Sequence, residues 1–130
     1  MKKRILLLAT GGTIASQATE EGLAPGLDGA ALASLLAESV LARYDVTVRD
    51  ILRLDSSNIQ PEEWQLIARH VFAAREDYDG IVITHGTDTM AYTAAALSYL
   101  IQYSAKPIVL TGAQRPLSDA ITDARRNLRD

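Results

Sequence analysis

The sequence predicts an α/β protein with a doubly wound parallel sheet, and three observations support this fold class. The first apolar run, residues 5–9, lacks polar alternation, which is typical of a strand covered on both faces. Apolar runs and helical segments then alternate four times along the chain, as in right-handed β-α-β crossovers. Each expected strand also ends in a polar or glycine-containing segment. Because parallel strands end at one edge of a sheet, we expect a single polar site there.

The composition of the chain is that of one small globular domain or a piece of one. It has 130 residues, of which 48% are hydrophobic and 22% charged. The formal net charge of -3 gives no basic footprint for nucleic acid or an anionic membrane, so a small soluble ligand is the expected partner. Cysteine is absent, which excludes disulfides and thiolate metal sites and leaves oxygen or nitrogen nucleophiles for catalysis.

The first expected strand ends in Gly11-Gly12, which is followed by Thr13. Glycines allow backbone angles that a side chain forbids, and they let a ligand approach closely. These residues are either a ligand-binding turn that presents Thr13 or a simple tight turn, and this stretch alone favours neither. The glycine spacing fits neither a dinucleotide-binding fingerprint nor a phosphate-binding loop.

The residues before this strand bear on the location of the protein. Residues 1–4 and the apolar run after them resemble a signal peptide, but about five apolar residues fall short of the roughly 7–15 that such a peptide needs. We therefore expect a cytoplasmic protein. No stretch approaches the ~20 apolar residues of a membrane helix, so no membrane association is expected.

The segment after Ser16 predicts a loop and then a helix. Residues 17–27 are polar and then punctuated by glycine and proline, which is typical of a loop, here either a lid over the first strand end or a simple connection. A helix is expected from Asp28, its N-cap, to Ala42. Its inward stripe consists of Leu32, Leu35, Leu36 and Val40.

The second strand is expected at residues 46–54, and Pro61 begins the next helix. Between them, Ser56 and Ser57 either cap that helix or face a ligand. The helix is expected to bury Trp64, Ile67, Ala68, Val71 and Phe72.

The rest of the chain predicts two further strands, at residues 80–83 and 107–110. A helix over residues 90–103 lies between them, and Thr87 or Asp88 is expected to cap it. A last helix is expected over residues 118–130.

Hydroxyl groups dominate the expected strand ends. They come from Thr10, Thr13, Ser56, Ser57, Thr84, Thr87, Thr89 and Thr111, beside the single carboxylate of Asp88. A threonine hydroxyl attacks a carbonyl when a base network withdraws its proton and N–H donors hold the oxyanion. This pattern therefore indicates acyl transfer from a small polar substrate, in which serine hydroxyls hold a carboxylate and Asp88 holds an ammonium.

Four motifs closely resemble the bacterial L-asparaginases. They are Thr10-Gly-Gly-Thr13-Ile-Ala, Asp55-Ser56-Ser57 ahead of Trp64, His85-Gly-Thr87-Asp88-Thr89-Met, and Thr111-Gly-Ala-Gln-Arg-Pro116. The start of the chain and residues 22–26 are most similar to the cytoplasmic type. The resemblance covers nearly the whole chain and implies that residues 1–130 are the Rossmann/flavodoxin-like N-terminal α/β domain of an asparaginase, truncated before its C-terminal domain.

The resemblance implies a role for each site residue. Thr13 is similar to the nucleophile that forms an acyl-enzyme, and Thr87 to the second catalytic threonine. Ser56 and Ser57 match the pair that contacts the substrate α-carboxylate, and Asp88 matches the residue that holds its α-ammonium. The implied reaction is hydrolysis of L-asparagine to L-aspartate and ammonia, with L-glutamine as a second candidate substrate and with neither a metal nor an organic cofactor.

The resemblance also implies parts that lie beyond these residues. The family partners its second threonine with a lysine further along the chain, and we expect the full-length protein to be a homo-oligomer, a dimer or a tetramer. Lys2, Lys3 and Lys106 are the lysines present, all at the amino ends of expected strands. Two alternatives remain open: the asparaginase-like subunit of a tRNA-dependent amidotransferase, and a non-catalytic, truncated amino-acid-binding module.

Overall fold

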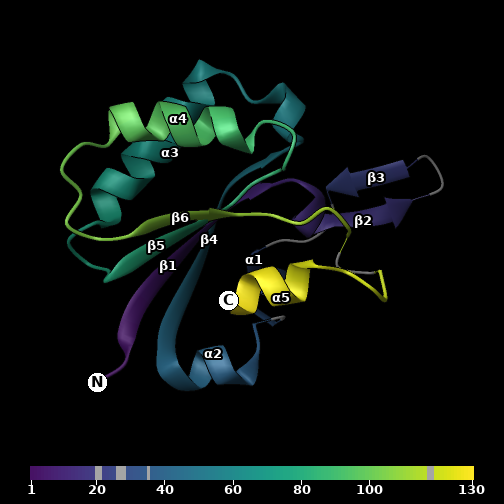
Figure 1. Cartoon of the computed structure of the whole chain (residues 1–130), viewed down its shortest axis with the longest axis horizontal. Helices are drawn as coiled ribbons and strands as arrows, with labels where there is room; N and C mark the ends of the chain where they lie inside the picture. The colour runs from purple at the N-terminus through teal and green to yellow at the C-terminus, as the bar shows by residue number, and fades with distance from the viewer. Residues whose placement is uncertain (20–21, 26–28, 35, 117–118) are drawn as a thin grey trace.

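A four-stranded parallel sheet forms the centre of the computed structural model, which describes residues 1–19, 22–25, 29–34, 36–116 and 119–130. The strands are β1 (Lys3–Gly11), β4 (Tyr44–Leu54), β5 (Gly80–Thr84) and β6 (Ile108–Thr111), in the spatial order β4-β1-β5-β6. All three neighbouring pairs are parallel, and helices cover both faces (Figure 1). The expected doubly wound α/β fold is confirmed.

β1 is buried from Leu6 to Gly11, and it pairs with β4 on one side and with β5 on the other. Its side chains alternate between two separate cores. Leu6 and Leu8 belong to one core, and Leu7 and Ala9 to the other. The apolar run without polar alternation is thus explained by burial on both faces.

One face of the sheet is covered by two long helices, α3 (Pro61–Ala74) and α4 (Met90–Leu100). α3 begins as expected at Pro61, and a reciprocal capping box between Gln60 and Glu63 satisfies its first N–H groups. The core on this face consists of Leu6, Leu8, Ile67, Ala68, Val71, Ala74, Ile81, Ile83 and Leu97.

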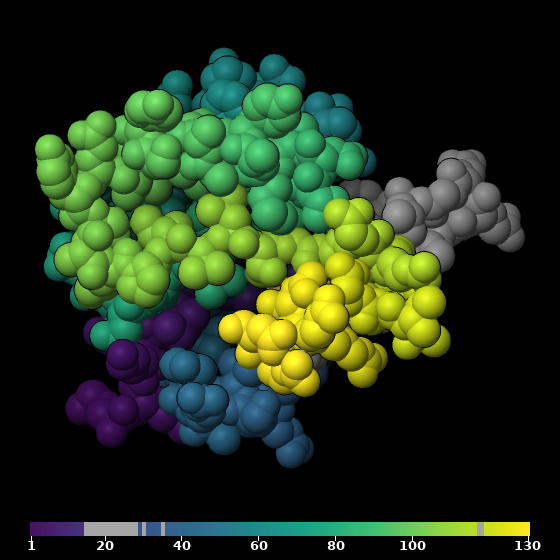
Figure 2. Space-filling view, in the orientation of Figure 1, coloured from purple at the N-terminus to yellow at the C-terminus, as the bar shows by residue number. Residues whose placement is uncertain are grey.

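The other face is covered by three short helices, α1 (Gly29–Ser34), α2 (Glu38–Arg43) and α5 (Ala124–Arg129). Figure 2 shows the C-terminal residues and those around α2 on the same side of the molecule. Between these helices the sheet is open to an apolar groove of about 620 Å³. Its lining includes Ile5, Leu7, Leu36, Val40, Val82 and Leu128.

The single helix expected from Asp28 to Ala42 is wrong, because the structure contains the separate helices α1 and α2. The backbone N–H of Gly29 donates to the Asp50 carboxylate of β4 at 2.8 Å, so a partner distant in sequence contacts the start of α1. Leu32 and Leu36 are buried as expected, whereas Val40 is half-buried. Asp28, the expected N-cap, and Leu35 lie outside the described residues.

The loop expected over residues 17–27 contains two strands, β2 (Ser16–Thr19) and β3 (Gly22–Pro25). They pair antiparallel, from Ser16 opposite Pro25 to Thr19 opposite Gly22, and the pair extends from the sheet (Figure 1). The ladder satisfies backbone groups that a loop would leave to water. Neither strand shows the alternation that predicts one, which is why the sequence did not indicate them.

Three smaller expectations are also corrected. Phe72 is 41% exposed, and the Arg75 guanidinium lies 4.7 Å from its ring centre. The helix expected over residues 90–103 ends at Leu100, and Tyr103 has a left-handed φ of 58° that a helix does not accommodate. The last helix begins at Ala124 rather than at Ser118, which lies outside the described residues.

In the part of the chain that is described, every helix is too short or too polar to cross a membrane.

Candidate functional site

The two middle strands bring the two threonine motifs to one edge of the sheet. The chain passes from β1 to β4 on one side of β1 and then to β5 on its other side, so the direction of winding reverses between β1 and β5. In open α/β sheets, ligands bind at such a reversal, outside the carboxyl ends of the strands. Thr13 follows β1 at this point, and Thr87 and Asp88 follow β5.

The turns after β1, β4 and β5 contact one another directly through glycine. Gly12 has a φ of +80°, and a Cβ atom there would lie 2.5 Å from the backbone nitrogen of Gly86. A Cβ on Gly86 would in turn lie 2.6 Å from Cβ and Oγ of Ser56. Only glycine permits these approaches. The glycines therefore assemble three strand ends at the site, which is more than a simple tight turn requires.

The turn after β6 joins the same cluster. A Cβ at Gly112 would collide with the carbonyl oxygen of His85 and would lie 3.3 Å from the methyl Cγ2 of Thr87. The Gly112 carbonyl oxygen accepts a hydrogen bond of 2.8 Å from Nδ2 of Asn127, in α5. All four strand ends are thus fixed relative to one another.

The expected site residues differ in exposure. Thr13, in the short 3-10 helix η1 (Thr13–Ala15), and Thr87 are half-buried, and Asp88 is exposed. The N-cap residue of α4 is Thr89, so the expectation that Thr87 or Asp88 caps that helix is wrong. The Thr89 hydroxyl instead donates to the carbonyl oxygen of Ser56 at 2.7 Å, which ties the β5 turn to the β4 turn.

The serine pair does not cap α3, because Gln60 performs that function. Ser56 is buried, with 2% of its surface exposed, and Ser57 is exposed. Both lie in the 3-10 helix η2 (Ser56–Asn58), which is capped by Asp55. The Ser57 hydroxyl and backbone N–H donate to the Asp55 carboxylate at 2.6 and 2.9 Å, and these two bonds lower the pKa of Asp55. The hydroxyl proton of Ser57 is therefore directed at Asp55 in this conformation.

Two other hydroxyls of the expected cluster lie inside the sheet. Thr10 is buried, and its hydroxyl donates to the carbonyl oxygen of Thr84 at 2.7 Å, a structural contact between β1 and β5. Thr84 is also fully buried, and among the described residues its own hydroxyl oxygen has no hydrogen-bond partner. Thr111 is half-buried and pairs with Thr84 across the β5–β6 ladder.

A buried histidine beneath the β5 turn was missed by the sequence reasoning. His85 is 0% exposed, and its ring lies 2.7 Å from the Gly86 carbonyl oxygen through Nδ1 and 2.8 Å from the Thr93 hydroxyl through Nε2. Nε1 of Trp64 donates to the same hydroxyl at 2.9 Å. Burial lowers the pKa of His85. The period of two along β5, which places Ile81, Ile83 and His85 on one face, is the signal that indicates its burial.

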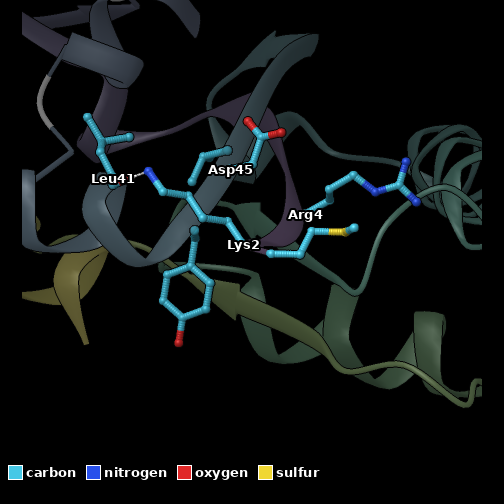
Figure 3. Close-up of a pocket in the computed structure, with 7 residues that line it drawn as sticks. Lys2, Arg4, Leu41 and Asp45 are labelled. Atoms are coloured by element: carbon cyan, nitrogen blue, oxygen red, sulfur yellow. Dashed lines mark hydrogen bonds between the residues drawn. The ribbon is translucent and has the colours of Figure 1, made fainter.

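The opposite edge of the sheet carries a cavity of a different kind. It has a volume of about 620 Å³, and its lining includes Lys2, Arg4, Leu41 and Asp45 (Figure 3). Nζ of Lys2 donates to the Leu41 carbonyl oxygen at 2.6 Å, whereas Arg4 points the other way. Among the described residues, no group of three or more His, Cys, Asp or Glu side chains is arranged to hold a metal ion.

The chain matches the model of the N-terminal asparaginase domain over residues 4–130. It belongs to the asparaginase family. The L-asparaginase of Thermococcus kodakarensis is 49% identical over 97% of this chain, and L-asparaginase 1 of Escherichia coli K12 is 44% identical over 98%. A solved structure of the thermostable L-asparaginase from Thermococcus kodakarensis superimposes with a TM-score of 0.86 at 48% identity, over 96% of this chain and 38% of that one.

Another relative of this chain carries a different name. A glutamyl-tRNA(Gln) amidotransferase subunit from Thermoplasma acidophilum is 38% identical over 97% of this chain, and the match covers 31% of that protein's length. The chain spans 38% of the length of each of the two asparaginases. These matches establish the family and the fold of these residues.

Proposed function

We propose that this chain is part of an L-asparaginase, an amidohydrolase that converts L-asparagine to L-aspartate and ammonia. The observation that carries the proposal is the contact of the Gly12 and Gly86 main chains, which holds the turns bearing Thr13 and Thr87 together where the winding of the sheet reverses. The identities of 44–49% to L-asparaginases support the choice of reaction.

Thr13 is the proposed nucleophile. Its Oγ attacks the side-chain amide carbon of asparagine, an ester bond forms as the C–N bond breaks, and the amide nitrogen leaves as ammonia. Water then cleaves the ester, which returns the Thr13 hydroxyl and releases aspartate. Thr87 is the proposed second catalytic threonine, which positions the attacking group. Its methyl lies near Gly112, where an added Cβ atom would come within 3.3 Å of it.

The backbone ends of the substrate define three further proposed roles. Asp88 is exposed beside the threonines, and its carboxylate binds the α-ammonium group. Ser56 and Ser57 are proposed to contact the α-carboxylate. Because the Ser57 proton is directed at Asp55, contact through the Ser57 hydroxyl requires it to rotate away from that carboxylate.

We further propose that residues 1–130 are the N-terminal α/β domain of a longer, homo-oligomeric protein, in which a lysine further along the chain partners Thr87. The coverage of 38% of each asparaginase relative supports this proposal. A cytoplasmic location is proposed because the apolar run after Arg4 forms the central strand of the sheet, so cleavage there as a signal peptide would remove the core of the fold.

Two alternatives differ from this proposal in a measurable way. The tRNA-dependent amidotransferase subunit passes ammonia to a partner protein, and a binding module only binds asparagine. Titrating asparagine by calorimetry while assaying free ammonia separates them. Steady release of free ammonia without a partner or tRNA supports the asparaginase, and saturable binding without release supports the module.

The proposal is tested by steady-state ammonia release from asparagine with the protein encoded by the complete reading frame. Thr13→Val removes the hydroxyl and keeps the shape, and it is expected to abolish release while the fold is retained. The matched control is Thr47→Val, the same change at an exposed position in the middle of β4, which is expected to leave release unchanged. Release at the wild-type rate by folded Thr13→Val protein would reject the assignment.

A further inference from the structure

The hydrogen bonds around His85 determine which of its ring nitrogens carries the proton. The Gly86 carbonyl oxygen can only accept, so Nδ1, 2.7 Å away, carries a hydrogen. The indole of Trp64 can only donate, so the Thr93 oxygen accepts from it. The Thr93 proton then points to the other ring nitrogen, Nε2, at 2.8 Å. One arrangement satisfies every group, in the order Trp64, Thr93, His85 and Gly86.

This chain of hydrogen bonds crosses three elements and is shielded from solvent. Trp64 lies on α3, Thr93 on α4, and His85 directly follows β5. Thr93 and His85 are both 0% exposed. Because burial lowers the pKa of His85, the ring is neutral at neutral pH, as a donor at Nδ1 and an acceptor at Nε2 require.

The series of hydrogen bonds ends at the Gly86 carbonyl, which belongs to the peptide that joins Gly86 to Thr87. The Gly86–Thr87 peptide is trans, so its C=O and the N–H of Thr87 point in opposite directions. When Nδ1 of His85 holds the carbonyl oxygen towards the core, the Thr87 N–H is turned away from the core. Gly86 itself lies against Gly12 and Ser56, so rotation of this peptide moves a residue that contacts both neighbouring turns.

We propose that His85 is a positioning residue: its Nδ1–H, aligned by Thr93 and Trp64, fixes the Gly86–Thr87 peptide plane and thereby the geometry of Thr87 relative to Thr13. The inference rests on the proposed asparaginase function. His85 does not touch the substrate, and it acts through the peptide that precedes Thr87. Disturbing it is expected to lower kcat more than it changes KM, because the substrate groups are bound by other side chains.

Two amide variants test which ring nitrogen of His85, Nδ1 or Nε2, is required. The amide nitrogen of Asn in His85→Asn reproduces a donor near Nδ1, whereas the longer side chain in His85→Gln places its amide near Nε2. In the full-length protein, His85→Asn is expected to keep kcat within about threefold, and His85→Gln to lower it by roughly 10²-fold, the scale of a misplacement of about 1 Å. Equal kcat values for the two variants would overturn the proposal.

Substitutions at Thr93 cover the case in which the His85 variants fail to fold. Thr93→Ser keeps the hydroxyl and is expected to keep kcat. Thr93→Val keeps the shape but removes the hydroxyl, and it is expected to lower kcat by about tenfold, as one net hydrogen bond implies. A Thr93→Val protein with unchanged kcat would also reject the proposal.

A spectroscopic measurement separates failure of this inference from failure of the proposed function. In protein labelled with ¹⁵N-histidine, assigned with His85→Asn, the His85 ring is expected to show a protonated Nδ1 and an unprotonated Nε2 at pH 7. In uniformly ¹⁵N-labelled protein, the Thr87 amide resonance should shift in His85→Gln and much less in His85→Asn. The opposite tautomer would overturn the inference even in an active enzyme. The expected tautomer in a protein that releases no ammonia would reject only the asparaginase function.

Discussion

The two edges of the sheet differ in how they use their polar groups. At the carboxyl edge, Ser56 and His85 are buried, and the turns touch through glycine main chains. At the amino edge, a cavity of about 620 Å³ is lined partly by exposed charged residues of both signs, such as Lys2, Arg4 and Asp45 (Figure 3). Cavity volume therefore does not point to the proposed site, because this cavity lies at the opposite edge of the sheet. Burial of polar groups and close approach of main chains distinguish the carboxyl edge instead, and burying a polar group is costly unless it is hydrogen-bonded.

The largest expected effect is on turnover by residues 1–130 alone, which should release no ammonia from asparagine. On the amino side of the sheet, Nζ of Lys2 donates a hydrogen bond to the Leu41 carbonyl oxygen, and Nζ of Lys106 donates one to that of Glu76. Lys3 begins β1 on the same side. A strand of about five residues spans roughly 17 Å, which no lysine side chain bridges. The measurement compares this chain with the protein from the complete reading frame. Comparable release by the two, lost on Thr13→Ala, would contradict the lysine argument.

The next largest effect compares two glycines at opposite ends of β5. Gly86→Ala is expected to reduce the free energy of unfolding by roughly 3 kcal/mol or more, because its Cβ would lie 2.6 Å from Ser56. Gly80→Ala, at the amino end, would meet side-chain atoms of Ile5 and Pro107 at 3.3 and 3.4 Å, and it is expected to cost about 1 kcal/mol. Chemical unfolding of both variants checks this. Equal losses would mean that the carboxyl edge is not packed more tightly than the amino edge.

A smaller effect is expected from removing one negative charge at each edge. Asp88→Asn should weaken the specificity constant for asparagine by roughly 1.5–3 kcal/mol, the scale of a hydrogen bond to a charged group. Asp45→Asn, also at an exposed aspartate, should leave it unchanged, since Asp45 lies beside the amino-edge cavity. The measurement is kcat/KM for both variants. An unchanged value for Asp88→Asn would reject the ammonium contact.

The smallest effect concerns pH. The pKa of His85 is lowered in the folded protein, so the unfolded chain binds more protons as the pH falls below the ordinary value of 6.5. The contribution of His85 to stability is therefore full above pH 6.5 and declines as the pH falls towards the folded pKa, by at most about 1.4 kcal/mol per pH unit. Replacing His85 with Asn should remove this component from the slope of unfolding free energy against pH. An unaltered slope would show that the ring is not buried as described.

Strand positions could be predicted from the sequence because their signals are local. The apolar runs of β1, β5 and β6 and the proline at the start of α3 were each correctly located within a few residues. The single helix over residues 28–42 was wrong because the chain forms α1 and α2 instead, and the start of α1 contacts Asp50 of β4, a partner distant in sequence. The β2–β3 pair was missed because neither strand has the apolar-polar alternation that predicts a strand, and each is stabilised by pairing with the other.

The placement of the candidate site residues was predictable to a similar extent. Strand-end logic places Thr13, Thr87 and Asp88 at one edge, and the sheet order agrees. The interpretation of Ser56 and Ser57 as caps of α3 failed because Gln60 and Glu63 form a better, reciprocal cap. The hydrogen bonds of His85 could not be predicted because its partner Thr93 and the neighbouring Trp64 come from two helices that meet only in the folded protein.

The identity of the nucleophile is tested most directly by trapping the acyl-enzyme. The full-length protein is mixed with asparagine, quenched in acid during turnover, digested and analysed by mass spectrometry. The account predicts an aspartyl group esterified to Thr13 in wild-type protein and no such adduct in Thr13→Val. An aspartyl group on Thr87 or any other residue, with Thr13 unmodified, would contradict it.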